Sequence, residues 1–165
     1  MSDVAEFLVR AVLIGIGATV VLDLWSLFAT RAFNTSAPNW TLVGRWIGHF
    51  PQGQFVQPHI SKARSVRGET ALGWTAHFAI GIFYAAVLIA IFGLDWARHP
   101  TPLPAFVVGL AAMTAPLFVM QPGMGLGIAA SRTQNPTRRR LNTLASHTAF
   151  SAGLYVCALL TAKFF

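Results

Sequence analysis

Four stretches of the chain are apolar over a length that crosses a membrane. Residues 11–30 contain Asp23 as their only charged residue, and residues 70–94 contain none. Two further uncharged stretches cover residues 101–131 and 141–162. Because about 20 helical residues cross a hydrocarbon core of about 30 Å, each stretch predicts a transmembrane helix.

The predicted fold class is all-α, a polytopic membrane protein built as a bundle of four transmembrane helices. We expect a single transmembrane domain over residues 1–165, with helices at about 7–31, 70–94, 103–121 and 141–163. The third helix should bend at Pro116 and loosen in QPGMGLG, because proline and glycine weaken helical order. The first stretch is too long for the apolar part of a signal peptide and lacks a basic segment before it, so we expect it to be retained.

Most basic residues lie in two loops, at 34–68 and 124–140, whereas the turn DWARHP is nearly balanced in charge. The segment before the first helix carries Asp3 and Glu6 ahead of Arg10. The excess of Lys and Arg in cytoplasmic loops of membrane proteins therefore predicts that both long loops are cytoplasmic and that both termini are outside.

Composition supports the membrane assignment. Charged residues make up 10% of the chain and hydrophobic residues 55%, whereas soluble domains carry about 25% charged residues. The net charge of +7 favours contact with anionic lipid headgroups, and we expect no nucleic-acid partner. A single cysteine, Cys157, excludes an intramolecular disulfide and a zinc site built on cysteines.

The first loop contains the aromatic segment NWTLVGRWIGHFPQGQF. Residues 40–50 of this segment mix tryptophan and phenylalanine with Arg45 and His49, which predicts a short amphipathic helix in the headgroup layer on the cytoplasmic side. This interfacial helix either anchors the loop or covers the cytoplasmic mouth of the space between the transmembrane helices.

Each predicted transmembrane helix carries one strongly polar side chain at a similar depth. At 1.5 Å per residue from the cytoplasmic edge, Asp23 and His77 lie about 12 Å deep, His147 about 10 Å and Gln121 about 16 Å. An ionisable residue at such depth costs about 2.5–3.5 kcal/mol and usually faces the protein interior. We therefore predict one intramembrane site at which these four side chains face one another. The alternative is that hydrogen bonds among them only hold the bundle together.

Two residues nearer the membrane surface extend this predicted site. Glu69 lies near its mouth and either pairs with an arginine or binds the ligand. Arg132 follows the glycine-rich segment GMGLGIAAS, whose backbone amides are candidates to hold a phosphate together with this arginine.

Several ligands fit a site of this composition. Asp23, His77 and His147 form a candidate metal site, since imidazole and carboxylate groups suit transition metals, although no HxxxH or HExxH motif supports it. Two facing histidines also suit the axial positions of a haem. A hydrogen-bonded quinone or lipid headgroup and a proton relay are the other options.

Five blocks of the chain together resemble a known family: IGIGATVVLDLWSLF, VGRWIGHF, GETALGWTAHFAIGI, FVMQPGMGLGIAASRTQNP and LASHTAFSAGLYV. They are similar to a family of small bacterial inner-membrane proteins that is known only as a domain of unknown function. The resemblance covers nearly the whole chain and implies a four-helix protein of the bacterial inner membrane. It implies no particular chemistry.

The sequence thus predicts an inner-membrane protein that binds a small ligand, metal ion or redox cofactor at a cytoplasmic-side Asp/His site, in transport or in electron or proton transfer. One alternative is a membrane-embedded enzyme on a lipid-linked or phosphorylated substrate, with a His–Asp pair for acid–base chemistry and Arg45, Arg132 and Arg138 for the phosphate. Another is a non-catalytic subunit of a larger membrane complex. Because four helices make a small bundle, we expect a homo-oligomer or a larger assembly.

Overall fold

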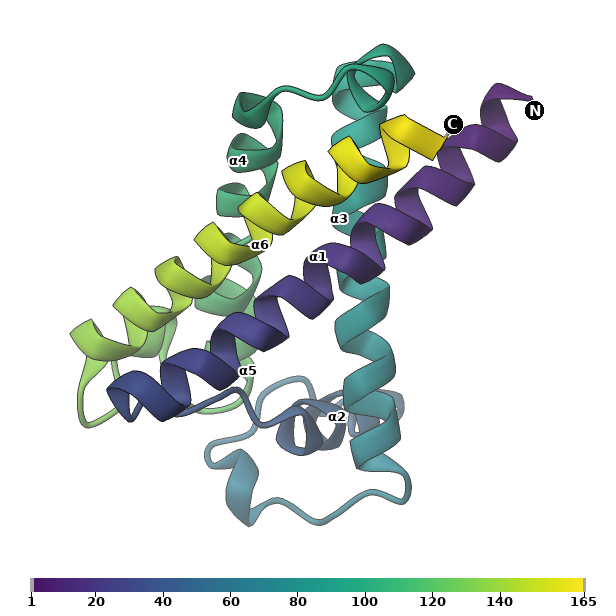
Figure 1. Ribbon diagram of the computed structural model, residues 1–165. Helices are drawn as coiled ribbons and strands as arrows, with labels where there is room; N and C mark the ends of the chain where they lie inside the picture. The colour runs from purple at the N-terminus through teal and green to yellow at the C-terminus, as the bar shows by residue number, and fades with distance from the viewer. Residues whose placement is uncertain (1, 165) are drawn as a thin grey trace. The chain divides into compact units, whose positions relative to one another are not determined.

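The computed structural model describes residues 2–164, which form helices and no strand (Figure 1). The longer helices in chain order are α1 (Asp3–Phe33), α2 (Trp40–Gly48), α3 (Glu69–Arg98), α4 (Pro102–Ala111) and α6 (Pro136–Phe164). Short helical segments between them are η1 (Phe50–Gln52), η2 (Ile60–Lys62), η3 (Pro116–Met120), α5 (Gln121–Gly123) and η4 (Ile128–Ala130). The all-α prediction is confirmed.

Four helical segments are long and apolar enough to cross a membrane: Asp3–Phe33, Glu69–Arg98, Pro102–Gly123 and Pro136–Phe164. They contain the four predicted helices at 7–31, 70–94, 103–121 and 141–163 completely. The helix predicted at residues 40–50 is present as α2, and its position in a headgroup layer stays a prediction.

The third span is less regular than predicted. Its α-helix already ends at Ala111, and a π-helix begins at Pro116. Proline has no N–H group, and its ring crowds the carbonyl four residues earlier, here that of Ala112. The irregularity therefore starts one turn before the proline rather than at it.

Contacts divide the chain into two compact units. The first unit comprises residues 2–36, 78–112 and 144–164, and the second comprises Ala37–His77 and Met113–Thr143. Helices α3 and α6 contribute to both units, and the single-domain organisation of residues 1–165 stays a prediction.

Small residues bring the helices of the first unit into close contact. Helix α1 runs antiparallel to α6 (Figure 1), and a Cβ atom at Gly153 would lie 2.8 Å from Cα of Ala18. Gly15 faces the backbone of Ile82 on α3 in the same way. Such close approach through glycine and alanine is the usual means of packing helices in membranes, where burial of apolar surface gives no driving force.

In the second unit, α2 lies directly on the first turns of α3. A Cβ atom at Gly44 would collide with the backbone carbonyl of Glu69, and one at Gly73 with that of Trp40. Val43 and Trp46 of α2 also pack in a cluster with Ile60 and Met124. Helix α2 is therefore fixed to α3 through backbone contact at two glycines.

Candidate functional site

Asp23 and His147 both belong to the first unit, and both are half-buried. Asp23 lies five residues after Ala18, and His147 lies six residues before Gly153, which contacts Ala18 across the α1–α6 interface. Since the two helices are antiparallel, both residues lie about 8–9 Å from this contact in the same direction. Asp23 and His147 therefore lie at a similar level along the α1–α6 pair, and their depth in a membrane stays a prediction.

Two threonines that share a helix face with Asp23 donate hydrogen bonds within α1 itself. Thr19 Oγ1 donates to the carbonyl of Gly15, and Thr30 Oγ1 donates to that of Ser26, both at 2.8 Å. Ser26 Oγ, one turn from Asp23, is buried and has no hydrogen-bond partner among the described residues. Ser26, which the sequence places on the same helix face as Asp23, is thus a further candidate ligand group.

His77 belongs to the second unit, where aromatic rings hold it. Its side chain is 7% exposed, and the ring of Trp40 stacks on it with centroids 3.7 Å apart and an interplanar angle of 23°. Trp74 approaches from another side, with a centroid distance of 5.8 Å. Stacking occupies a face of the imidazole, whereas the two ring nitrogens lie in the plane of the ring. The aromatic walls therefore fix the orientation of His77.

Gln121 also belongs to the second unit and is only 4% exposed. It directly follows the π-helix, and its backbone N–H donates to the carbonyl of Pro116, five residues earlier. Its side-chain Oε1 is buried and has no hydrogen-bond partner within the described residues. Wide helical turns of this kind recur at functional sites, and a buried acceptor without a donor is costly. Gln121 therefore combines two independent signs of a binding position.

Glu69 pairs with an arginine, one of its two predicted roles. Arg45 holds both carboxylate oxygens of Glu69, with Nη2–Oε1 and Nε–Oε2 distances of 2.7 and 2.9 Å. The backbone N–H of Val66 also donates to Oε2, and Arg45 Nη1 donates to the carbonyl of Ala63. The hydrogen bonds to Glu69 raise the pKa of Arg45. Both side chains are thus committed to fastening α2 to α3.

Replacing Glu69 by glutamine should lower the melting temperature of the purified protein, because the amide cannot accept both guanidinium hydrogen bonds. Differential scanning fluorimetry in detergent measures this effect. Arg67→Gln, at an exposed position two residues away, is the control and should leave the melting temperature unchanged. Equal melting temperatures for the Glu69 variant and the parent protein would contradict a fastening role.

A buried charged cluster at the other end of α1 was missed by sequence reasoning. Arg10 is fully buried; its Nε donates to Glu6 Oε1 at 2.8 Å, and its Nη1 donates to the carbonyl of Ala97 at 2.9 Å. Arg98 binds the same glutamate, with an Nη2–Oε2 distance of 2.7 Å. The spacing of Glu6 and Arg10 by one helical turn was the available signal, but Arg10 was interpreted as the edge of a span.

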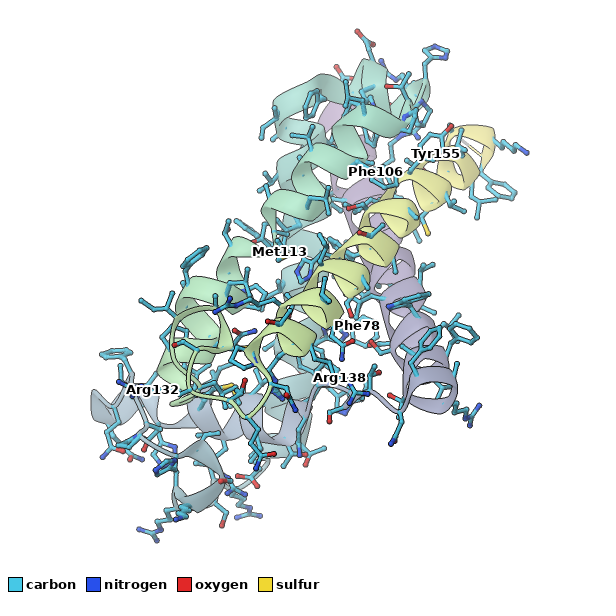
Figure 2. All side chains as sticks on the ribbon, turned by 90° about the vertical axis from the view of Figure 1, so that its left-hand side faces the viewer. Phe78, Phe106, Met113, Arg132, Arg138 and Tyr155 are labelled. Carbon is cyan, nitrogen blue, oxygen red and sulfur yellow. The ribbon has the colours of Figure 1, made fainter. Side chains whose placement is uncertain are left out.

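Arg132 and Arg138 lie on the chain between α5 and the first turn of α6, and both are exposed (Figure 2). The stem of Arg132 lies against Gly127, where an added Cβ atom would approach its Cγ to 2.9 Å. Arg132 therefore belongs to the surface turn of the second unit rather than to its buried polar groups.

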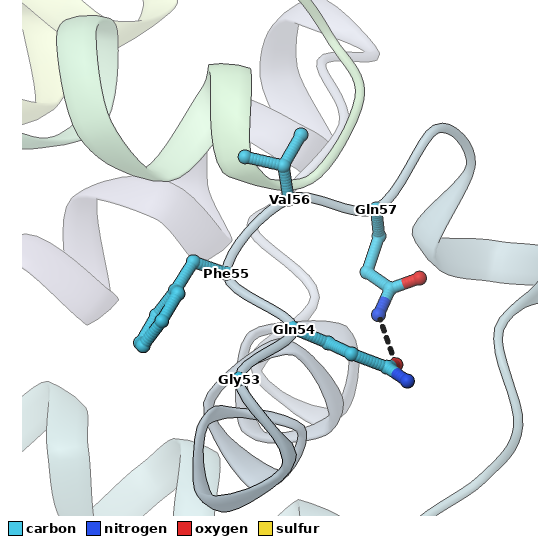
Figure 3. A pocket seen from close by; sticks show the side chains of 5 residues that line it. All are labelled: Gly53, Gln54, Phe55, Val56 and Gln57. Atoms are coloured by element: carbon cyan, nitrogen blue, oxygen red, sulfur yellow. Dashed lines mark hydrogen bonds between the residues drawn. The ribbon is translucent and has the colours of Figure 1, made fainter.

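A shallow depression of about 440 Å³ lies at residues 53–57 (Figure 3). One continuous segment lines it, in which Gln57 Nε2 donates to Gln54 Oε1 at 3.1 Å. The lining includes no titratable side chain, and Phe55 and Val56 are largely exposed. The depression is a feature of a surface loop and offers no group for chemistry.

A family model described as "Protein of unknown function (DUF2938)" matches residues 12–161. The chain belongs to the DUF2938 family. Comparisons with curated proteins and with solved structures gave no match. The expected membership in a family of unknown function is confirmed, and the description of DUF2938 assigns no activity to its members.

The metal hypothesis gains no support from the geometry of this DUF2938 protein. Residues 2–164 include no group of three or more His, Cys, Asp or Glu side chains placed to hold a metal ion. Asp23 and His147 belong to the first unit and His77 to the second. Their joint use as metal ligands stays a prediction.

Proposed function

We propose that this DUF2938 protein is a multi-pass protein of the bacterial inner membrane that binds a small ligand at buried polar side chains of its second unit. Gln121 supplies a hydrogen-bond acceptor, and His77 is the candidate second contact from the same unit. The bound molecule carries an N–H or O–H donor. Asp23, Ser26 and His147 form a further polar group in the first unit.

The buried Oε1 of Gln121 carries this proposal. A buried acceptor without a donor costs about 1–3 kcal/mol, and polar side chains inside membrane spans are rare unless they have a function. A ligand donor would offset this cost. The π-helix before Gln121 supports the same interpretation, since it sets the direction of the side chain at the expense of regular helical hydrogen bonding.

The distribution of charge supports an orientation in the inner membrane. Basic residues concentrate in the segments 34–68 and 124–140, which we place in the cytoplasm, with both termini outside. The bilayer is the first partner of such a chain. A second copy, or a larger membrane complex, would cover helix faces that the small bundle leaves exposed.

The state of Arg45 weighs against the alternative of an enzyme on phosphorylated substrates. That alternative uses Arg45 as a phosphate ligand, but the guanidinium group already binds both oxygens of Glu69. Binding a substrate phosphate there would require breaking a bidentate ion pair.

Replacing Gln121 by leucine tests the proposed ligand site. Mass spectrometry of small molecules that co-purify with the protein in lipid nanodiscs should reveal a compound whose occupancy falls about tenfold in this variant, because one hydrogen bond is lost. The ligand-free variant should also be more stable than the parent, because an unsatisfied buried acceptor has been removed.

Gln134→Leu makes the same chemical change at an exposed position of the second unit and should leave occupancy unchanged. Identical small-molecule inventories for the parent protein and Gln121→Leu would overturn the proposed function. In that case the buried polar side chains would serve only to hold helices together.

A further inference from the structure

The net charge of the protein lies entirely in its second unit. The first unit contains four basic and four acidic residues. The second contains one acidic residue, Glu69, and eight basic residues: Arg45, Lys62, Arg64, Arg67, Arg132, Arg138, Arg139 and Arg140. Glu69 is bound to Arg45, and the second unit therefore carries a net charge of +7.

A turn with an uncommon backbone precedes four of these basic residues in the chain: Arg132, Arg138, Arg139 and Arg140. Ala129 and Ala130 both adopt positive φ angles, of 48° and 61°, and Gly127 precedes them with a φ of 75°. Left-handed conformations cost alanine roughly 1–2 kcal/mol per residue. The turn is held closed by hydrogen bonds from Ala130 N–H to the carbonyl of Gly127 and from Arg132 N–H to that of Leu126. Strain maintained in this way is frequent where backbone groups clamp a ligand.

The conformation of this turn gathers backbone donors at the surface. Ile128 is helical and Ala129 is left-handed, a sequence that points consecutive N–H groups toward one concave side. Within residues 2–164, the N–H groups of Ile128 and Ala129 donate no hydrogen bond. The side chain of Ile128 is 60% exposed, so the turn lies at the surface of the unit.

Two arginines are attached to the same turn. Arg140 Nε donates to the carbonyl of Ala129 at 2.8 Å, and the stem of Arg132 lies against Gly127. Both side chains are exposed. A guanidinium group has five N–H donors in a planar fork that matches phosphate oxygens, so each arginine keeps donors for an anion.

We propose that residues 127–132 and Arg140, here called the turn site, bind the phosphate group of an anionic phospholipid headgroup. Backbone amides and two guanidinium groups supply the donors, and phosphate oxygens accept them. A lipid is favoured over a soluble phosphate because large apolar side chains are exposed beside the cations: Ile128 and Leu141, each 60% exposed. The turn site uses neither the side chain of His77 nor that of Gln121, and it does not depend on the function proposed for them.

Native mass spectrometry with phosphatidylglycerol and phosphatidylcholine in equal amounts tests the turn site. The parent protein should retain phosphatidylglycerol preferentially. Arg132→Gln and Arg140→Gln should each weaken its retention by at least tenfold, as expected for loss of a hydrogen bond between charged groups. Arg64→Gln removes one exposed positive charge from the same unit and should reduce retention by less than twofold.

Equal losses in Arg64→Gln and Arg132→Gln would overturn the proposal, because they would show that only diffuse charge attracts the lipid. Competition by inorganic phosphate distinguishes the sources of the anion. Displacement of the lipid supports recognition of its phosphate, whereas binding of inorganic phosphate without retention of phosphatidylglycerol would overturn the lipid assignment.

The backbone contribution can be separated from that of charge. Ala129→Gly permits the same left-handed conformation without its cost and should preserve retention of phosphatidylglycerol. Ala129→Val disfavours that conformation and should lower retention, although no charge changes. Equal retention by the glycine and valine variants would overturn the role of the turn.

Discussion

Replacing Arg10 by methionine is expected to lower the free energy of unfolding by about 3 kcal/mol. Arg10 is fully buried and joins two helices, because it binds Glu6 on α1 and the carbonyl of Ala97 near the end of α3. Methionine fills much of the same space but donates no hydrogen bond. The buried carbonyl of Ala97 then loses a donor, and Glu6 keeps only the partner provided by Arg98.

Equilibrium unfolding in mixed micelles measures this effect for Arg10→Met. Arg31→Met is the matched control, since it makes the same change at an exposed position of the same helix and should alter stability by less than about 0.5 kcal/mol. A methionine variant as stable as the parent would show that the cluster makes no net contribution. That outcome is known for some buried ion pairs whose desolvation cost cancels their attraction.

Replacing Gly73 by alanine should be the second most damaging change, with a loss of about 3 kcal/mol, at the upper end of the range for overpacking. The added methyl group would collide with the backbone carbonyl of Trp40, which cannot move away as a flexible side chain can. Helix α2 would have to shift, and the stacking of Trp40 on His77 would be lost with it.

Thermal unfolding and the tryptophan emission spectrum together check the effect of Gly73→Ala. Thr75→Ala, at an exposed position on the same helix, is the control for helix propensity and should leave both measurements unchanged. An alanine variant with the parent spectrum and stability would contradict the close crossing of α2 and α3.

The helices could be predicted because their signals are local. Length and lack of charge identified four segments able to cross a membrane, and the mixed aromatic and basic pattern identified α2. Counting residues from the charged edges also predicted a common depth for Asp23 and His147, and this depth stays a prediction. These predictions needed only helical geometry.

The features that sequence reasoning missed depend on distant residues or on backbone detail. Glu6 and Arg98 are 92 residues apart in sequence, and only the folded chain brings them together. Pro116 signalled a break in the helix, but not that the following turn would widen and direct Gln121. Nor does alanine favour a left-handed backbone, so the strain at Ala129 and Ala130 could not be foreseen.

The way α2 is attached restricts how this segment can move. Two glycine contacts and the Arg45–Glu69 pair attach residues 40–45 of α2 to residues 69–73 of α3. To move away from α3 as a lid, α2 would have to break these backbone contacts and the ion pair. Any movement of α2 would therefore move the first turns of α3 with it, and the orientation of His77, on which Trp40 stacks, would change.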